Sequence, residues 1–278
     1  MSETVISAAV VKQLRDQTGI GMMDCKKALE ESNGDFELAV EYLRKKGQKV
    51  SAKRADREAK EGVVIALVSD DHTKGIVVKL SSETDFVAKN EDFIDLTRRI
   101  ASHALNTFFD DKESLLDSTF ESVTLRDKIM ERVAAIGEKI ELANYEKIEA
   151  PLVVSYIHMG NKAGVILGLN KTGDNIVEAG KNVAMQVAAM HPIAVDESNV
   201  DASIVAKEIE IGKEQARAEG KPEEMLEKIA IGKLNKFYKE STLINQAYVK
   251  DGKVNVQQYL SSVDKDLKVT GFKHVKLG

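Results

Sequence analysis

The spacing of apolar and polar residues changes along this chain, and the first stretch has a helical period. From about residue 5 to 47, apolar residues recur three or four positions apart, which predicts three short helices. Ser7 and Asp35 are the expected N-caps, and Gly47 is the expected end of the third helix. A three-helix unit of this size buries little apolar surface, so we expect a small, mobile docking head on a charged tether.

From Gly62 onward the period becomes that of strands, and the pattern occurs twice. Two β-branched runs are joined by a polar turn near Asp70–Gly75, and a helix pattern follows Asn90. The runs Leu152–His158 and Val165–Leu169, followed by a helix through Val183, repeat this order. The pattern therefore predicts an α+β fold with two related hairpin-plus-helix halves.

A third pattern interrupts the second half. Two helical stretches, 201–219 and 222–238, are separated by a Gly-Lys-Pro turn, which predicts a projecting antiparallel helical hairpin. Its thin apolar stripe is expected at Ile204, Ile211 and Ala218. The strand expected over 139–145 is taken to lead into the second half.

These patterns predict five parts. They are a three-helix head (1–47), a charged linker helix (48–61), an N-terminal core subdomain (62–139), a C-terminal core subdomain (140–200 and 239–278), and a helical-hairpin insertion (201–238).

Composition restricts the class of protein. The length of 278 residues allows roughly two domains, and a net charge of −5 argues against a general binder of nucleic acid. No apolar run reaches the ~18 residues that span a bilayer, and Met1–Thr4 shows no signal peptide, so no membrane partner and a cytoplasmic location are expected. One basic run, from Arg44 to Lys60, is an exception: it favours a solvated linker helix, with contact to RNA or an acidic partner as the alternative.

Chemistry is hard to find in this sequence. There is no phosphate-binding loop, and Gly19-Ile20-Gly21 lacks the third glycine of a dinucleotide fingerprint. The five histidines are scattered, and the single cysteine, Cys25, is expected to be a small buried hydrophobe. We therefore expect no cofactor, no metal and no covalent catalysis.

The segment Ser82–Asn90 is the most informative in the chain. It places Phe86 beside the carboxylate of Asp85 where a strand pattern changes to a helix pattern, with Asn90 as the expected N-cap. Phe86 precedes the apolar helical stripe of Phe93, Leu96, Ile100 and Ala104. Periodicity alone leaves open whether this ring is buried or exposed.

Two long motifs carry a resemblance to a known family. Ser82–Asn90 and Leu14–Leu29 resemble the two signatures of the elongation factor Ts family, in its order and spacing. Weaker, collinear similarity continues through Ser155–His158, Gly220–Pro222 and Val269–Phe272. The chain departs from the family at Lys79 and Ser81, where Glu and Asn are more usual.

The resemblance implies a function and a set of contacts. It implies a guanine nucleotide exchange factor that promotes GDP release from elongation factor Tu, and a head like a ubiquitin-associated (UBA) domain. It implies that Phe86 enters an apolar pocket of the partner's G domain while Asp85 makes polar contacts there, disturbing the phosphate and Mg²⁺ site. The residues that it implies as contacts are Thr84, Asp85, Phe86 and Val87 at the Mg²⁺-displacement region, Lys12, Leu14, Arg15 and Met22 in the head, and His158 in the second half.

Alternatives stay open at this stage. Leu14 and Met22 are equally compatible with packing inside the head. A rival function is a non-exchange adaptor with a UBA-like head and a dimerisation arm, and a third is RNA binding through the basic run. A homodimer and a heterotetramer with the GTPase are both compatible with the sequence.

Overall fold

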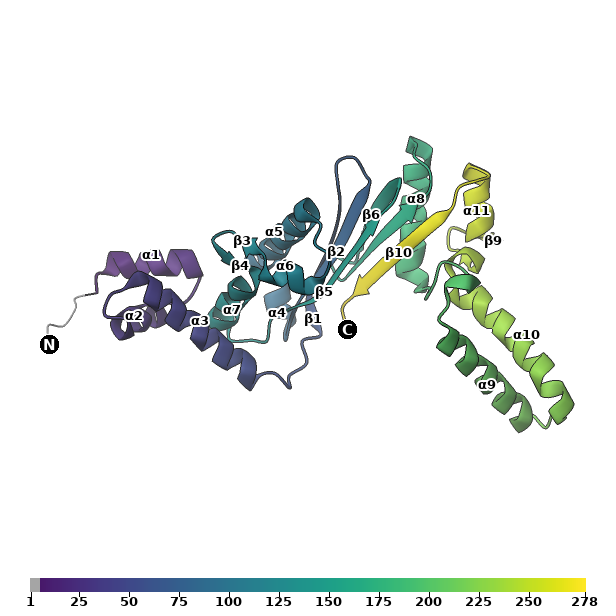
Figure 1. The fold of residues 1–278 in the computed structure, drawn as a ribbon, viewed down its shortest axis with the longest axis horizontal. Helices are drawn as coiled ribbons and strands as arrows, with labels where there is room; N and C mark the ends of the chain where they lie inside the picture. The colour runs from purple at the N-terminus through teal and green to yellow at the C-terminus, as the bar shows by residue number, and fades with distance from the viewer. Residues whose placement is uncertain (1–5) are drawn as a thin grey trace.

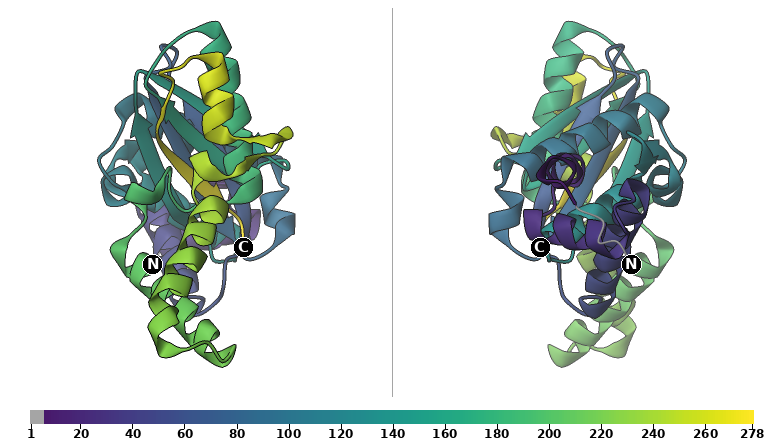
Figure 2. Two further views of the ribbon diagram at one scale, coloured as in Figure 1. Left: turned by 90° about the vertical axis from the view of Figure 1, so that its right-hand side faces the viewer. Right: turned by 90° about the vertical axis from the view of Figure 1, so that its left-hand side faces the viewer.

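The computed structural model describes residues 6–278 and has an α+β fold, as the sequence predicts. Figure 1 shows the parts arranged from one side to the other: a helical head, a helical layer, two sheets and a second helical layer. A helical hairpin extends from the far side of this body, away from the head (Figures 1 and 2). The expected absence of a signal peptide concerns residues that lie outside the described part of the chain.

The head consists of three helices: α1 (Ala8–Thr18), α2 (Met22–Glu31) and α3 (Phe36–Lys53). Both predicted N-caps are confirmed, because the side chain of Ser7 accepts a hydrogen bond from Val10 and that of Asp35 accepts one from Leu38. Gly19 ends α1 with φ of 72°, in the left-handed conformation that favours glycine. The core of the head consists of Val11, Leu14, Ile20, Cys25, Ala28, Leu29, Ala39, Val40, Leu43 and Ala134.

The prediction that Gly47 ends the third helix is wrong. The helix continues six residues further, to Lys53, and Gly47 is buried inside it. A Cβ atom at Gly47 would lie 2.1 Å from the carbonyl oxygen of Met130 on a neighbouring helix. The glycine therefore serves close packing of the head against the rest of the chain, and the head is docked on the core instead of hanging from a tether.

The first sheet has the order β1-β2-β5, from β1 (Glu61–Val68), β2 (Lys74–Ser82) and β5 (Glu141–Glu149), all antiparallel. The expected assignment of residues from 140 onward to the second half is therefore wrong for β5, which pairs with β2. One face of this sheet is covered by helices. They are α4 (Asp85–Ala88), α5 (Glu91–Thr107), α6 (Lys112–Asp117) and α7 (Leu125–Ile136), with a small hairpin of β3 (Thr119–Phe120) and β4 (Val123–Thr124).

The second sheet has the order β10-β7-β6, from β6 (Leu152–His158), β7 (Ala163–Leu169) and β10 (Val269–Lys276). The predicted hairpin of β6 and β7 is confirmed. The elements packed on its outer side are α8 (Asp174–Met190), η2 (Leu243–Asn245), β8 (Ala247–Tyr248), β9 (Asp251–Asn255) and α11 (Val256–Val263), and a short η1 (Glu197–Asn199) leads into the helical hairpin.

The two sheets pack against each other through a small apolar core. Val64 and Val77 of the first sheet meet Val153 and Ile166 of the second. A Cβ atom at Gly75 would lie 2.6 Å from Val153, so a larger residue there would separate the sheets. The two halves therefore share one interior.

The predicted helical hairpin is confirmed as α9 (Ala202–Ala218) and α10 (Glu223–Ser241), with Pro222 as the N-cap residue of α10. The predicted apolar stripe is wrong: Ala218 and Ile204 are exposed, and Gly212 and Ala216 are buried instead. They pack against Leu226, Ala230 and Leu234 of α10. The small residues let the helices approach closely, a feature that an apolar periodicity does not reveal.

Among the described residues, no helix is long and apolar enough to cross a membrane.

Candidate functional site

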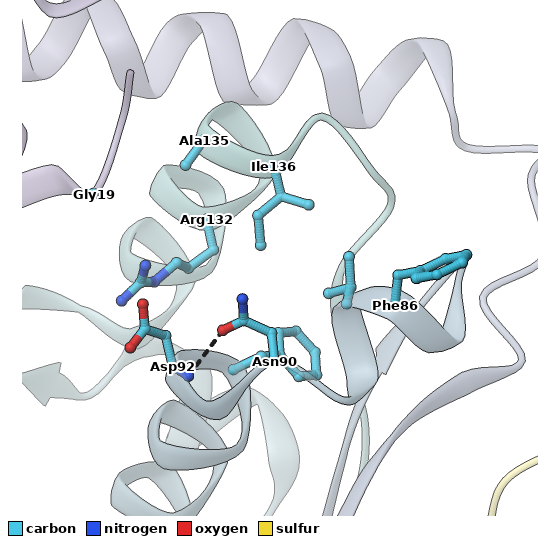
Figure 3. A pocket seen from close by; sticks show the side chains of 9 residues that line it. Gly19, Phe86, Asn90, Asp92, Arg132, Ala135 and Ile136 are labelled. Atoms are coloured by element: carbon cyan, nitrogen blue, oxygen red, sulfur yellow. Dashed lines mark hydrogen bonds between the residues drawn. The ribbon is translucent and has the colours of Figure 1, made fainter. Parts of the chain in front are cut away.

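The corner between β2 and α5 carries the most exposed phenylalanine side chain of the fold. Phe86 lies on the single turn α4 and is 84% exposed. Its neighbour Val87 turns inward and packs against the first core. Figure 3 shows the Phe86 ring at the edge of a groove, pointing away from Arg132 and Asn90. The question that periodicity left open is thus answered by the structure: the ring is on the surface.

Glu83 anchors this corner to two distant segments. One guanidinium nitrogen of Arg54, Nη1, donates to both carboxylate oxygens of Glu83 at 2.7 and 2.8 Å, and the amide of Lys139 donates to Oε1 at 2.6 Å. Burial raises the pKa of the Glu83 carboxyl, but the hydrogen bonds from Lys139 and Arg54 outweigh it and hold the pKa below its ordinary value. The carboxylate is therefore ionised and fixed at neutral pH.

Thr84 is held in the same way by the segment that follows α7. Its amide and hydroxyl donate to the two carboxylate oxygens of Glu138 at 3.1 and 2.7 Å. The hydroxyl of Ser82 donates to the carbonyl of Thr84 at 3.0 Å. The residues before Phe86 are thus braced from α3 and from the loop after α7, so the backbone that carries the ring is fixed.

Asp85 faces solvent beside the ring. Its carboxylate accepts a hydrogen bond from Lys89 at 2.6 Å, and this bond lowers the pKa of Asp85. Both side chains are largely exposed, and such surface pairs contribute little energy. Asp85 is therefore free to exchange Lys89 for another polar group.

A groove of about 330 Å³ separates the head from the corner. It runs between the Gly19 turn of the head, the α4–α5 corner, and the α7 residues Arg132 and Ile136 (Figure 3). Asn90 is on its wall and accepts a hydrogen bond from the amide of Asp92 at 2.9 Å, which confirms the predicted N-cap. The head and Phe86 thus lie on opposite sides of one groove.

The head residues expected to contact a partner divide into two groups. Lys12 and Arg15 are exposed on α1, and Met22 is 39% exposed at the start of α2. Leu14 is fully buried in the head core, which favours the packing alternative over a side-chain contact with a partner. Met23, which was not among the contact residues expected from the sequence, is 77% exposed. Its exposure could have been predicted from the sequence, because Met23 does not share the helical face of the buried residues Cys25, Ala28 and Leu29.

His158 ends β6, and its Nδ1 lies 3.1 Å from the hydroxyl of Tyr156. The next residue, Met159, is 71% exposed and was also missed. Two of the histidines that are far apart in the sequence, His191 and His274, come together in the fold, where their rings stack at 5.1 Å. Within residues 6–278, no group of three or more His, Cys, Asp or Glu side chains is placed to hold a metal ion.

Cys25 is a buried hydrophobe, as predicted. Its thiol donates to the carbonyl oxygen of Ile20 at 3.4 Å, and burial raises the thiol pKa. The thiol is therefore protonated at neutral pH and makes no nucleophilic site.

The basic run between Arg44 and Lys60 is largely paired within the chain. Arg44 contacts Glu131, Lys46 contacts Asp24, and Arg54 and Arg57 contact Glu83. Helix α3 ends at Lys53, so the expected linker helix over 48–61 is wrong for its second half. Cations that are neutralised in place provide less attraction for a polyanion.

The departures at Lys79 and Ser81 lie on β2. The amine of Lys79 donates to the carbonyl of Lys276, and burial lowers the pKa of this amine. Ser81 is fully buried. Lys79 thus links β2 of the first sheet to β10 of the second.

Comparisons with known proteins place these features in context. A family model described as "Elongation factor TS" matches residues 83–278. The chain is 54% identical to the elongation factor Ts of Flavobacterium psychrophilum and 53% identical to that of Christiangramia forsetii, in each case over 98% of this chain and 99% of the relative. It is 46% identical to the elongation factor Ts of Porphyromonas gingivalis, over 96% of each chain.

Proposed function

Because this chain belongs to the elongation factor Ts family and so acts in translation elongation, we propose that it promotes GDP release from the GTPase elongation factor Tu in the cytoplasm. The observation that carries this proposal is the 84% exposed ring of Phe86 on a braced turn. A single exposed apolar side chain is ordinary on a protein surface. The carboxylate of Glu83, which is only 11% exposed, and the two hydrogen bonds of Thr84 to Glu138 fix this turn and distinguish it from an ordinary surface.

In the proposed complex, the ring of Phe86 fills an apolar pocket of the partner's nucleotide-binding domain. Aromatic anchors of this kind commonly carry about 2 kcal/mol or more of an interface. Asp85 exchanges its weak pairing with Lys89 for a polar contact on the partner. Thr84 and Val87 support the ring through contacts within this chain. Thr84 bonds to Glu138, and Val87 packs against the first core.

Nucleotide release follows from linkage. If the factor binds the empty GTPase more tightly than the GDP-bound form, GDP affinity falls by the same ratio. Each ~1.4 kcal/mol of this difference weakens GDP binding tenfold. No covalent chemistry and no cofactor of this chain is needed for that effect.

Further contacts hold the partner while the ring acts. On the head, the exposed residues Lys12, Arg15, Met22 and Met23 suit this role, and at the end of β6 so do His158 and Met159. All six are separate from the braces of the corner. These six residues contribute to the affinity for both forms of the partner. Phe86 contributes the difference in affinity between the empty and the GDP-bound form.

Phe86→Ala tests the proposal directly. Release of a fluorescent GDP analogue from elongation factor Tu is followed at a limiting concentration of the factor, and we expect a loss of about tenfold or more. Ile231→Ala, which removes a 48% exposed apolar side chain from the helical hairpin, is the matched control and should retain full acceleration. Unchanged GDP release with Phe86→Ala would remove the ring from the mechanism. Equal affinity of the wild type for GDP-bound and empty partner would favour the non-exchange adaptor instead.

A further inference from the structure

Helix α3 of the head lies directly on α7 of the core. At Gly47 the α3 backbone is so close to Met130 that a Cβ atom would lie 2.1 Å from its carbonyl oxygen and 3.2 Å from the Cβ of Ala134. Ala134 is itself part of the head's apolar core. One helix of the core therefore completes the interior of the head.

An ion pair with one buried partner crosses this contact. The Nε of Arg44 on α3 donates to Oε1 of Glu131 on α7 at 3.2 Å, and the Glu131 side chain is only 6% exposed. Lys128, 14% exposed, lies 3.4 Å from the other carboxylate oxygen, and Arg44 also lies 3.7 Å from Asp127. A buried carboxylate with cations on two sides is sensitive to geometry, because a shift of α3 would remove Arg44 and leave only Lys128, on its own helix, to balance its charge.

The same helix connects the head to the corner that carries Phe86. At the far end of α3, Arg54 holds Glu83, three residues before the ring. On the other side of the groove, the Gly19 turn of the head lies against the guanidinium of Arg132 on α7. Both sides of the groove are therefore held by α3, α7 and the residues directly after them.

We propose that Glu131, through its pair with Arg44, is a positioning residue that fixes the head at a set distance from Phe86. This inference rests on the proposed function, because it assumes that the head and the ring contact the same GTPase. A fixed head binds without first losing conformational freedom, and its contacts add to those of the ring at a high effective concentration. Glu131 itself contacts neither the partner nor the nucleotide.

The head position is tested first in the chain alone. Spin labels at Lys27→Cys on the head and Asp95→Cys on α5, both exposed, report the distance between them, and the buried Cys25 stays unlabelled. We expect one narrow distance distribution in the wild type and a broader or shifted one in Glu131→Leu. Glu41→Ala, which breaks an exposed pair with Lys45 on the same helix, is the matched control and should keep the narrow distribution. If Glu131→Leu fails to fold, Arg44→Met serves, because Lys128 still neutralises Glu131.

GDP release from the GTPase then tests the consequence. Freeing the head should raise the concentration of factor that gives half-maximal release by about tenfold, and leave the maximal rate within about twofold, because only the ordering of the head is lost. An unchanged half-maximal concentration or an unchanged distance distribution in Glu131→Leu would overturn the positioning role. If Phe86→Ala leaves GDP release unchanged, the proposed function fails. The distance measurement in the chain alone does not depend on that function, and it still tests whether Glu131 fixes the head.

Discussion

Arg54 and Glu83, 29 positions apart in the sequence, form a bifurcated ion pair at 2.7 and 2.8 Å that ties the end of the head helix to the Phe86 corner. The Glu83 side chain is 11% exposed, so this pair is screened from water better than the surface pairs of the fold.

Arg54→Ala should lower the free energy of unfolding by about 2 kcal/mol, because a charged hydrogen-bonded partner is removed from a nearly buried carboxylate. Urea unfolding followed by circular dichroism measures this change. Lys45→Ala removes a cation of the same helix that pairs on the surface with Glu41, and it should change the free energy of unfolding by no more than about 0.5 kcal/mol. Equal losses of unfolding free energy in the two variants would show that the Arg54–Glu83 pair stabilises the fold no more than a surface pair does.

The same carboxylate predicts a dependence of stability on acid. The folded pKa of Glu83 lies below its ordinary value of 4.5, so the unfolded chain takes up its proton first as the pH falls. The stabilisation by Glu83 is complete above pH 4.5 and is lost as the pH falls below that value. Glu83→Gln should therefore be less stable than the wild type at pH 7, and the gap should narrow in unfolding measurements toward pH 3. A gap that is constant with pH would contradict the lowered pKa.

His274 predicts a second effect of pH, in a higher range. Burial, together with the nearby His191 and Lys276, lowers the pKa of His274 to about 4 from the ordinary 6.5. The unfolded chain therefore binds this proton between pH 6.5 and 4, and stability falls across that interval with a slope approaching about 1 kcal/mol per pH unit. His274→Phe should flatten this part of the stability profile. A slope that persists in the variant would assign it to other groups.

The close contact at Gly47 is a test of how the head is docked. Gly47→Ala places a Cβ atom against the Met130 carbonyl, a backbone group that cannot move aside, and should lower the free energy of unfolding by about 2 to 3 kcal/mol. Gly232→Ala, in α10 with open space around the new methyl group, should instead stabilise by up to about 1 kcal/mol, because alanine favours the helix. Calorimetry separates the two variants, and a neutral Gly47→Ala would show that the head is not closely packed on α7.

Replacing two phenylalanines seven residues apart should change the stability by very different amounts. Phe86 is 84% exposed, so Phe86→Ala should change the free energy of unfolding by less than about 0.5 kcal/mol. Phe93 is 3% exposed in the first core, and Phe93→Ala should lower it by about 3 to 5 kcal/mol. Chemical denaturation of both variants checks this contrast. A large loss with Phe86→Ala would show that the ring supports its own fold.

Local signals in the sequence predicted local structure well. The N-caps Ser7, Asp35 and Asn90 and both strand hairpins were predicted because their residues act on neighbours within a few positions. Gly47 was misread because a glycine that ends a helix and one that admits a neighbouring helix look alike in sequence. The pairing of β5 with β2 and the docking of α3 on α7 depend on distant residues, which one sequence does not report.

In the candidate site, too, the local motif could be predicted from the sequence, whereas its long-range contacts could not. The motif around Phe86 was evident, but periodicity did not settle the exposure of the ring. The braces Arg54, Glu138 and Lys139 were not found, because they approach Glu83 and Thr84 only in the folded chain. Two uses stayed open for Leu14 in the sequence, because a residue of a recognised motif can pack inside the head or face a partner, and its full burial favours packing.

The bracing of Phe86 has a mechanical consequence. The ring stands on one helical turn whose preceding residues are bonded to α3 and to the loop after α7, so it yields little under load. When a braced group presses into a more compliant surface, the strain accumulates in the compliant one. If the nucleotide site of the GTPase is the more compliant partner in the proposed complex, the strain falls there.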